Sequence, residues 1–180
     1  MWDIQAGIVN QCFLLRFSLK IGIDINHTKC FSGGNTTYTN NIIDQLSKLD
    51  LDIINLVTFS SNKKFNNKKV NTFYTDIIWS HVLLPKEIKN NNINLFHSTV
   101  GVLPIKKSCP QIITIHDTIN YIYEKYFNTW HNYYTKYFLP KSAYQADKII
   151  AVSNSTKNDI IKYLNVDENK IEVIYEASSP

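Results

Sequence analysis

Hydrophobic and polar residues follow two patterns along this chain, one of short apolar runs and one of longer stretches that are apolar on a single helical face. The short runs are rich in β-branched residues, which is typical of buried strands. They lie at residues 20–26, 52–60, 70–74, 94–99, 110–117, 148–153 and 170–176. The longer stretches predict helices, which we expect at residues 36–50, within 77–92, at 121–146 and at 155–165. Strands that alternate with helices predict an α/β fold with a doubly wound, mostly parallel sheet and helices on both faces.

Polar side chains follow two of the expected strands at the point where each strand ends. His116 and Asp117 close one run, whereas Ser153, Ser155 and Thr156 follow the apolar residues IIAV. The carboxyl ends of parallel strands meet at one edge of the sheet, and ligand sites in such sheets lie in the crevice outside that edge. We therefore expect these side chains where binding or chemistry takes place.

Each of these residues also has a structural interpretation, which the sequence leaves open. A histidine at a strand end can exchange a proton near neutral pH, but it can equally be a hydrogen-bonded structural residue. Asp117 points the opposite way along an extended chain, so we do not expect it to orient His116. The hydroxyl of Ser155 can cap the helix that follows it. His97 ends another short strand and has the same two interpretations.

Gly33 and Gly34 lie between the first expected strand and the first expected helix. Glycines at such a position let the backbone take a positive φ and approach a ligand closely. The start of the following helix offers unpaired N–H groups and a partial positive charge. A plain turn needing glycine explains the pair as well. Neither the GxGxxG spacing of dinucleotide-binding loops nor the lysine of a P-loop occurs here.

The composition predicts one globular domain, because the chain has 180 residues, of which 44% are hydrophobic and 19% charged. Its three cysteines are far apart and lack zinc-binding spacing, so we expect reduced thiols, a cytoplasmic location and no metal site. No apolar run is long enough to span a membrane, and the extension at residues 1–19 lacks the pattern of a signal peptide. Nucleic-acid binding is not expected, because the basic residues have no interleaved aromatic pattern.

Several segments in order carry a more specific signal. They read IGIDIN followed by SGGNTTYTNNIIDQL, LFHSTVGVLP, CPQIITIHDT, LPKSAYQADKIIAVSNSTKNDI and NKIEVIYEASSP. Together they resemble the N-terminal, Rossmann-like domain of a family 4 glycosyltransferase of the GT-B type, over residues 20–180. The resemblance implies that this domain binds the acceptor. A second Rossmann-like domain would bind the nucleotide-sugar donor, with the reaction in the cleft between them.

The resemblance also implies roles for individual residues. His116 would help to hold the transferred sugar and act in catalysis, and His97 would shape the acceptor pocket. The loop of Gly33, Gly34 and Asn35 would face the cleft, near the donor phosphates and the acceptor. The further substrate contacts expected are Asp117, Ser153, Ser155 and Thr156. No cofactor and no metal are implied, since the nucleotide-sugar is a substrate bound mainly by the second domain.

The chain stops at Pro180, where the family would continue into the donor domain, so we expect that domain to be absent. Glu168 and Glu176 have the spacing of the family's donor-site glutamate pair, but we reject the match because the glycine-rich context is missing. The expected function is thus the acceptor half of sugar transfer to a saccharide or lipid-linked acceptor, inactive alone. The chain would then be a fragment, a truncated gene product, or one piece of a split transferase whose partner is a separate donor-domain polypeptide. The alternative is a non-catalytic α/β module that binds carbohydrate or a partner protein.

An aromatic-rich segment covers residues 121–138. The rings near one helical face are those of Tyr126, Trp130, Tyr133 or Tyr134, and Tyr137. Such a stripe is typical of packing within a core or between domains. If the stripe is exposed, it can stack on sugar rings or contact a membrane surface, so peripheral membrane contact stays open.

Overall fold

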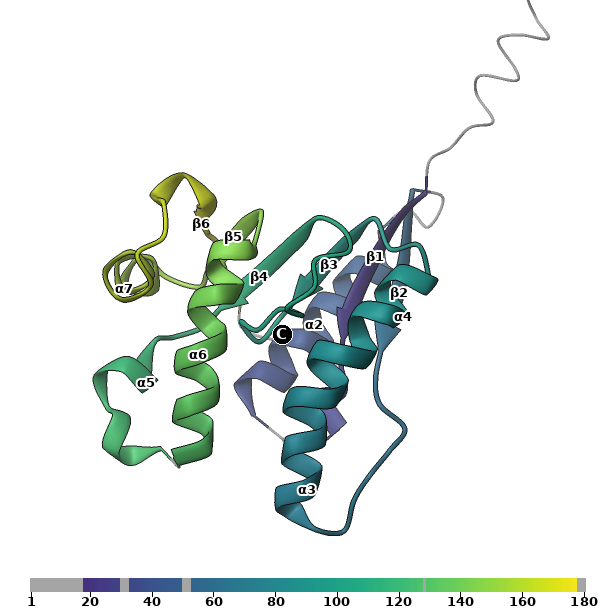
Figure 1. Cartoon of the computed structure of the whole chain (residues 1–180). Coiled ribbons are helices and arrows are strands. Elements are labelled where there is room, and N and C mark those ends of the chain that lie inside the picture. The colour runs from purple at the N-terminus through teal and green to yellow at the C-terminus, as the bar shows by residue number, and fades with distance from the viewer. Residues whose placement is uncertain (1–17, 30–32, 50–52, 128, 178–180) are drawn as a thin grey trace, which may run out of the picture.

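The computed structural model describes residues 18–29, 33–49, 53–127 and 129–177. In this part of the chain, six strands form one sheet in the order β2-β1-β3-β4-β5-β6 (Figure 1). The strands are β1 (Leu19–Asp24), β2 (Ile54–Phe59), β3 (Leu95–Ser98), β4 (Gln111–Ile115), β5 (Lys148–Ala151) and β6 (Ile171–Val173). Every neighbouring pair is parallel. The expected parallel α/β fold is therefore confirmed.

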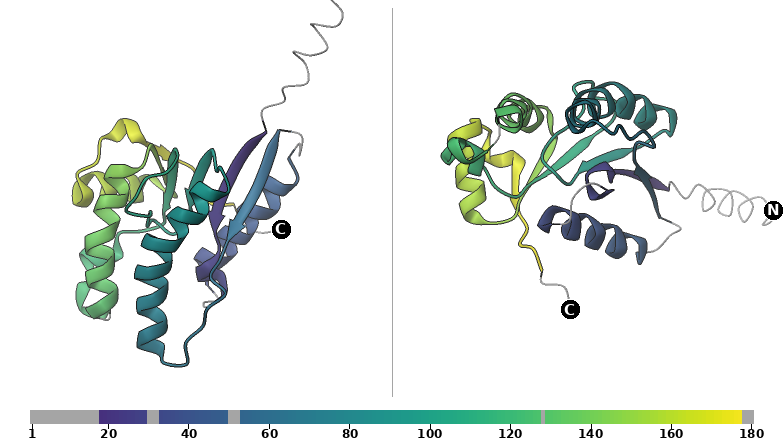
Figure 2. Two further views of the ribbon diagram at one scale, coloured as in Figure 1. Left: turned by 45° about the vertical axis from the view of Figure 1, so that its right-hand side comes forward. Right: turned by 90° about the horizontal axis from the view of Figure 1, so that it is seen from below.

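Helices cover both faces of the sheet, as a doubly wound fold requires (Figure 2). One face carries α2 (Gly34–Ser47). The other carries α3 (Lys68–Phe73), η2 (Tyr74–Leu83), α4 (Leu84–Asn90), α6 (Thr129–Gln145) and α7 (Asn154–Leu164). The shorter segments are η1 (Asn26–Lys29), α5 (Ile119–Ile122), η3 (Glu124–Tyr126) and η4 (Glu168–Lys170). No helix of the described residues is long and apolar enough to cross a bilayer.

The segment expected as a strand at residues 70–74 is helical instead. The side chain of Asn67 accepts hydrogen bonds from the backbone N–H groups of Lys69 and Val70 and thereby caps α3. The helix runs on directly into η2, a π-helix, which is a form often found at functional sites. The β-branched and aromatic residues that favoured a strand are thus placed along one helix that packs on the sheet.

Smaller corrections concern element ends. The first long helix ends at Ser47, and the last strand is confined to Ile171–Val173. Ser153, and not Ser155, caps α7, because its hydroxyl accepts the backbone N–H of Thr156 at 3.0 Å. Residues 1–17 of the expected extension, with Cys12, and also Cys30, lie outside the described residues.

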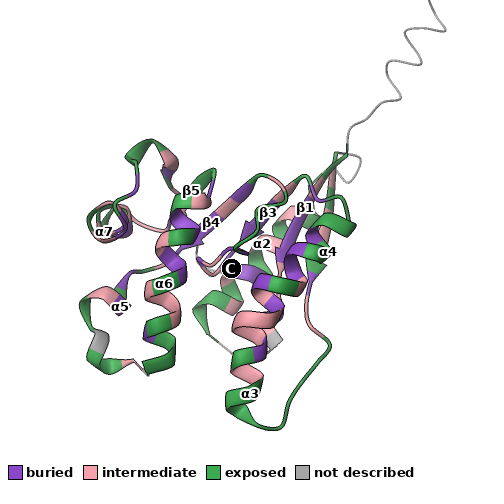
Figure 3. Cartoon of the chain, in the orientation of Figure 1, coloured by how far each residue is buried: buried purple, intermediate pink, exposed green. Residues whose placement is uncertain are grey.

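The core lies between the sheet and the helices of its second face, and Figure 3 shows the buried residues along the strands. Phe96, Ile113, Ile149 and Ile160 are among its fully buried side chains. Burying a side chain of this size contributes roughly 1.5–3 kcal/mol. This packing fixes the strands in register, so the residues that follow them are brought to one edge.

The connections change direction between β1 and β3, which are neighbours in the sheet. The connection after β1 leads to α2 on one face. The loop after β3 crosses the other face, where the backbone N–H of Leu103 donates to the Ser142 hydroxyl of α6 at 2.8 Å. Gly101 makes the turn of this loop in the left-handed region, with φ 77°. The crevice at such a switch point is where open α/β sheets bind their ligands.

Candidate functional site

His116 directly follows β4 and is held at the carboxyl edge of the sheet from two sides. Its Nε2 lies 2.9 Å from the carbonyl oxygen of Thr99, and its Nδ1 lies 2.7 Å from Oε1 of Glu176. The ring of Tyr38 meets the imidazole edge-on, at a centroid distance of 4.8 Å. The side chain of His116 is 16% exposed and that of Glu176 is 44% exposed. Glu176 is therefore the outer partner of the imidazole.

Both partners of the His116 ring are hydrogen-bond acceptors, so both contacts are satisfied when the ring donates from both nitrogens. A ligand oxygen that contacts the ring must replace one of them. The Thr99 carbonyl belongs to the backbone and stays in place, whereas the Glu176 side chain can rotate into solvent. The Nδ1 side is consequently the side at which a ligand can enter.

A chain of hydroxyl groups beneath His116 links the sheet to α2. The Thr39 hydroxyl donates to the carbonyl of Asn35 at 2.8 Å and lies 2.7 Å from the hydroxyl of Thr99. Nε2 of His27 lies 3.0 Å from the same Thr39 oxygen. The hydroxyl of Thr39 has one proton, which it donates to the Asn35 carbonyl. Thr99 and His27 are therefore the donors in their contacts with Thr39. The chain fixes Thr99, whose carbonyl in turn holds His116.

His97 lies behind this edge, under α2, and is 8% exposed. Its Nε2 is 2.9 Å from the hydroxyl of Thr114, which also lies 3.1 Å from the Tyr38 hydroxyl. Burial lowers the pKa of His97 to about 4, so the ring is neutral at pH 7. Burial also lowers the pKa of His27, and the nearby His116 adds to this effect. The structure places His97 as a support for Thr114 and Tyr38, and it brings His27 to the site, which the sequence pattern missed.

The other predicted substrate contacts are Ser153, Ser155 and Thr156 after β5, and Asp117 next to His116. Of these described residues, only Thr156 is hydrogen-bonded to His116. The Thr156 hydroxyl donates to the carbonyl of His116 at 3.1 Å, which ties the end of β4 to α7. Ser153 caps α7, and Ser155 is exposed on it. The Asp117 carboxylate accepts the N–H of Ile119 at 3.0 Å and begins α5, so it is engaged away from the imidazole.

Gly33 and Gly34 lie at the start of α2 and are exposed. Gly33 has φ 177°, an extended conformation open to any residue, and Gly34 is helical. The predicted positive φ of this pair is therefore wrong. A Cβ atom built on either residue would meet no heavy atom within 4 Å. Together with the exposed Asn35, the pair leaves the start of α2 open to a ligand.

Asp24 ends β1 at the same edge, and the sequence pattern does not single it out. Nε1 of Trp79 in η2 lies 3.2 Å from each carboxylate oxygen, and the N–H of Asn26 donates to Oδ1 at 3.0 Å. Burial raises the pKa of Asp24 to about 6, which outweighs the lowering by these hydrogen bonds. The one signal in the sequence is an acidic residue at the end of the first apolar run.

The aromatic stripe divides into packed and exposed rings. Phe138 stacks on His81, with centroids 4.1 Å apart, and Tyr134 tilts against Phe138 at 4.7 Å. Nε1 of Trp130 donates to Asp76 of η2 at 2.8 Å, which joins α6 to η2. The rings left largely exposed are those of Tyr126, Tyr133 and Tyr137. Packing thus explains only the inner half of the stripe.

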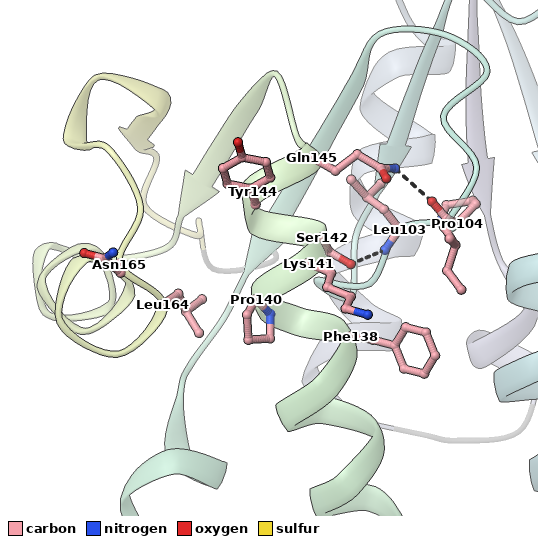
Figure 4. Close-up of a pocket in the computed structure, with 11 residues that line it drawn as sticks. Leu103, Pro104, Phe138, Pro140, Lys141, Ser142, Tyr144, Gln145, Leu164 and Asn165 are labelled. Atoms are coloured by element: carbon pink, nitrogen blue, oxygen red, sulfur yellow. Dashed lines mark hydrogen bonds between the residues drawn. The ribbon is translucent and has the colours of Figure 1, made fainter.

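A separate hollow of about 560 Å³ lies beside the C-terminal half of α6 (Figure 4). It is lined by Leu103, Pro104, Ile105, Phe138, Pro140, Lys141, Ser142, Tyr144, Gln145, Leu164 and Asn165. The lining includes none of His116, Thr99, Tyr38 and Glu176. Among the residues that the structure describes, no group of three or more His, Cys, Asp or Glu is placed to hold a metal ion.

Comparisons with known proteins give the chain a family context. The model of Glycosyltransferase Family 4 matches residues 32–177. The O-antigen chain mannosyltransferase RfbU of Salmonella typhimurium (strain LT2) is 28% identical over 135 residues, which are 74% of this chain and 36% of that protein. The crystal structure of a glycosyltransferase from Rickettsia africae ESF-5 is 15% identical, with a TM-score of 0.39, over 89% of this chain and 43% of that one.

The chain spans about a third of the length of the curated relative it matches. The family model, in contrast, matches well over half of this chain. It extends from the loop before α2 to the segment after β6, and so includes His116, Thr99, Tyr38 and Glu176. The chain therefore belongs to Glycosyltransferase Family 4.

Proposed function

We propose that residues 20–180 are the acceptor-side domain of a glycosyltransferase, which takes part in moving a sugar from a nucleotide-sugar donor to a saccharide or lipid-linked acceptor. The observation that supports this most directly is the position of His116. Its imidazole lies at the carboxyl edge of a parallel sheet, in contact with Tyr38 and Glu176. The relative from Salmonella is named as a mannosyltransferase, which makes mannose the first sugar to test.

In this proposal, the imidazole of His116 contacts the sugar during transfer. The reaction breaks the bond between the anomeric carbon and the nucleotide phosphate and forms a bond from that carbon to the acceptor oxygen, while the proton of the acceptor hydroxyl passes to the leaving phosphate. Once Glu176 releases Nδ1, this atom can donate to a sugar hydroxyl or to the leaving phosphate. Thr99 and Thr156 hold the ring and its backbone, so little reorganisation is needed when the ligand binds. No metal and no cofactor are proposed.

The proposal includes a donor domain, on this or on a separate polypeptide, to complete the cleft. The 180 residues alone are then expected to bind an acceptor without turning over. Co-expression with candidate donor-domain polypeptides from the same genome tests this. Radiolabelled mannose from GDP-mannose should reach lipid-linked saccharides only when both parts are present. Transfer by this chain alone would contradict an acceptor-only role.

His116→Ala should abolish most of that transfer, whereas His131→Ala, an exposed position on α6, should not. Equal loss in both variants would contradict a specific role for His116. Saccharide binding without transfer in every pairing would favour the non-catalytic carbohydrate-binding module. A cytoplasmic location remains a prediction from the sequence.

The exposed tyrosines also support contact with a membrane that carries the acceptor. Nζ of Lys141 lies 3.6 Å from the ring centroid of Tyr137, and Nζ of Lys125 lies 5.1 Å from that of Tyr126. Tyrosines favour the headgroup region of a bilayer, and lysines attract anionic lipids. The chain should sediment with phosphatidylglycerol vesicles and not with phosphatidylcholine vesicles. Failure to sediment with either kind would contradict the contact.

A further inference from the structure

The carboxylate of Asp24 is a second chemical group at the edge that contains His116. It belongs to β1, whose neighbour β3 lies across the switch point of the sheet. His116 and its partners lie toward α2, whereas Asp24 contacts Trp79 of η2 on the opposite face. The two groups therefore lie at the same edge of the sheet, on its opposite faces.

One carboxylate oxygen of Asp24 can accept a further hydrogen bond. Oδ1 accepts from the backbone of Asn26 and shares the indole proton of Trp79, whereas Oδ2 has only the shared contact with Trp79. A carboxylate oxygen can accept two hydrogen bonds. Asn26 is itself fixed, because its side chain accepts the N–H of Ser61 at 3.1 Å. The carboxylate is thus rigidly oriented, and the side chain remains partly exposed.

A purely structural role does not account for a charged residue here. No ion pair of Asp24 occurs within the described residues, and its hydrogen-bond donors are the neutral groups of Trp79 and Asn26. Trp79 donates to it, and the Tyr134 ring and the Asp76 carboxylate lie on the same side. An asparagine would serve Trp79 and Asn26 equally well without the cost of burying a charge. Groups kept at such a cost are frequent at functional sites.

We infer that Asp24 is a ligand-binding carboxylate, and that its Oδ2 accepts a hydrogen bond from a hydroxyl of the acceptor saccharide. This inference rests on the proposed function. A carboxylate repels the phosphates of a nucleotide-sugar, so a neutral polyol is the ligand that suits the Asp24 side of this edge. Trp79 is the positioning residue, because the N–H of its buried indole contacts both carboxylate oxygens and holds their orientation.

The test uses the isotope-labelled chain and methyl α-D-mannopyranoside as the probe, followed by NMR. The carboxyl carbon of Asp24 and the indole N–H of Trp79 should shift saturably. Asp24→Asn replaces one carboxylate oxygen, the acceptor, by an amide donor, and should raise the apparent Kd at least tenfold. Asp44→Asn is the matched control, since Asp44 is an exposed carboxylate of α2 paired with Lys48, and it should bind like the wild type.

The outcomes separate this inference from the function on which it rests. Saturable shifts at Tyr38 and His116 without any at Asp24 and Trp79 would overturn the inference and leave the proposed function standing. Absence of a response at every one of these residues would overturn both. A folded Asp24→Asn variant with unchanged affinity would also overturn the inference. The folding of the variant is checked by its amide spectrum, and its urea midpoint at pH 7.5 should rise.

Discussion

Replacing Asp24 by asparagine should make the protein more stable at neutral pH, which is unusual for a change at a partly buried, hydrogen-bonded residue. Asparagine has nearly the same shape and keeps an oxygen for Trp79 and for the N–H of Asn26. It removes the charge and replaces the other carboxylate oxygen, Oδ2, by an amide nitrogen. A residue that served stability alone would behave in the opposite way, because losing its stronger hydrogen bonds would weaken the fold.

The magnitude follows from the pKa of Asp24, which rises from 3.8 to about 6 on folding. Because the folded state holds the proton more tightly than the unfolded state, ionisation of Asp24 favours unfolding. The cost is absent below about pH 4, grows between about pH 4 and pH 6, and is constant above that range. A difference of about two pKa units corresponds to at most about 3 kcal/mol. This is a large part of the roughly 5–15 kcal/mol that stabilises a typical domain.

Urea unfolding followed by circular dichroism at pH 4 and at pH 7.5 measures this effect. With a slope of about 2 kcal/mol per molar urea, the midpoint of the variant should rise by roughly 1–1.5 M at pH 7.5 and stay unchanged at pH 4. Asp44→Asn, the exposed control, should show no such pH dependence. A lower midpoint for Asp24→Asn at pH 7.5, or the same shift at both pH values, would show that the charge of Asp24 does not destabilise the folded state.

The remaining predictions concern the imidazole, a helix cap and the core. His116→Ala should lower turnover of the assembled enzyme by a factor on the order of 10² to 10⁴ if the ring acts as an acid or base, and an unchanged rate of mannosyl transfer would exclude that role. Asn67→Ala removes the cap of α3 and should cost about 1 kcal/mol of unfolding free energy in urea; no loss would mean that the cap is dispensable. Ile149→Ala truncates a fully buried side chain and should cost about 2–5 kcal/mol in the same assay, and a cost below about 1 kcal/mol would contradict its place in the core.

Most of the sheet could be predicted because its strands are nearly continuous β-branched runs. The runs that contain Ile23, Ile113 and Ile149 are buried on both faces, which is what such a pattern indicates. The segment at residues 70–74 misled the prediction, because its composition favours a strand while the cap at Asn67 starts a helix. The π-helix that follows could not be predicted, since no residue pattern distinguishes it from an ordinary helix.

The position of His116 was predictable, because a polar residue after a buried strand must lie at the carboxyl edge. Its partner Glu176 was not, because the contact joins residues 60 positions apart and depends on the register of β4, β5 and β6. The role of Asp24 was not predictable either, because its partner Trp79 belongs to η2 and lies 55 positions away in the sequence. Single site residues at strand ends can be predicted from the sequence, but which residues contact each other follows only from the packing of the folded sheet.

Photo-crosslinking with a diazirine-bearing mannoside, followed by peptide mass spectrometry, is the sharpest single test of where this domain binds saccharide. Labelling should concentrate on the loops at the carboxyl edge, around Asp24, Thr99, His116 and Glu176, and excess methyl α-D-mannopyranoside should suppress it. Labelling confined to the hollow beside α6, or unaffected by the competitor, would contradict a saccharide site at this edge.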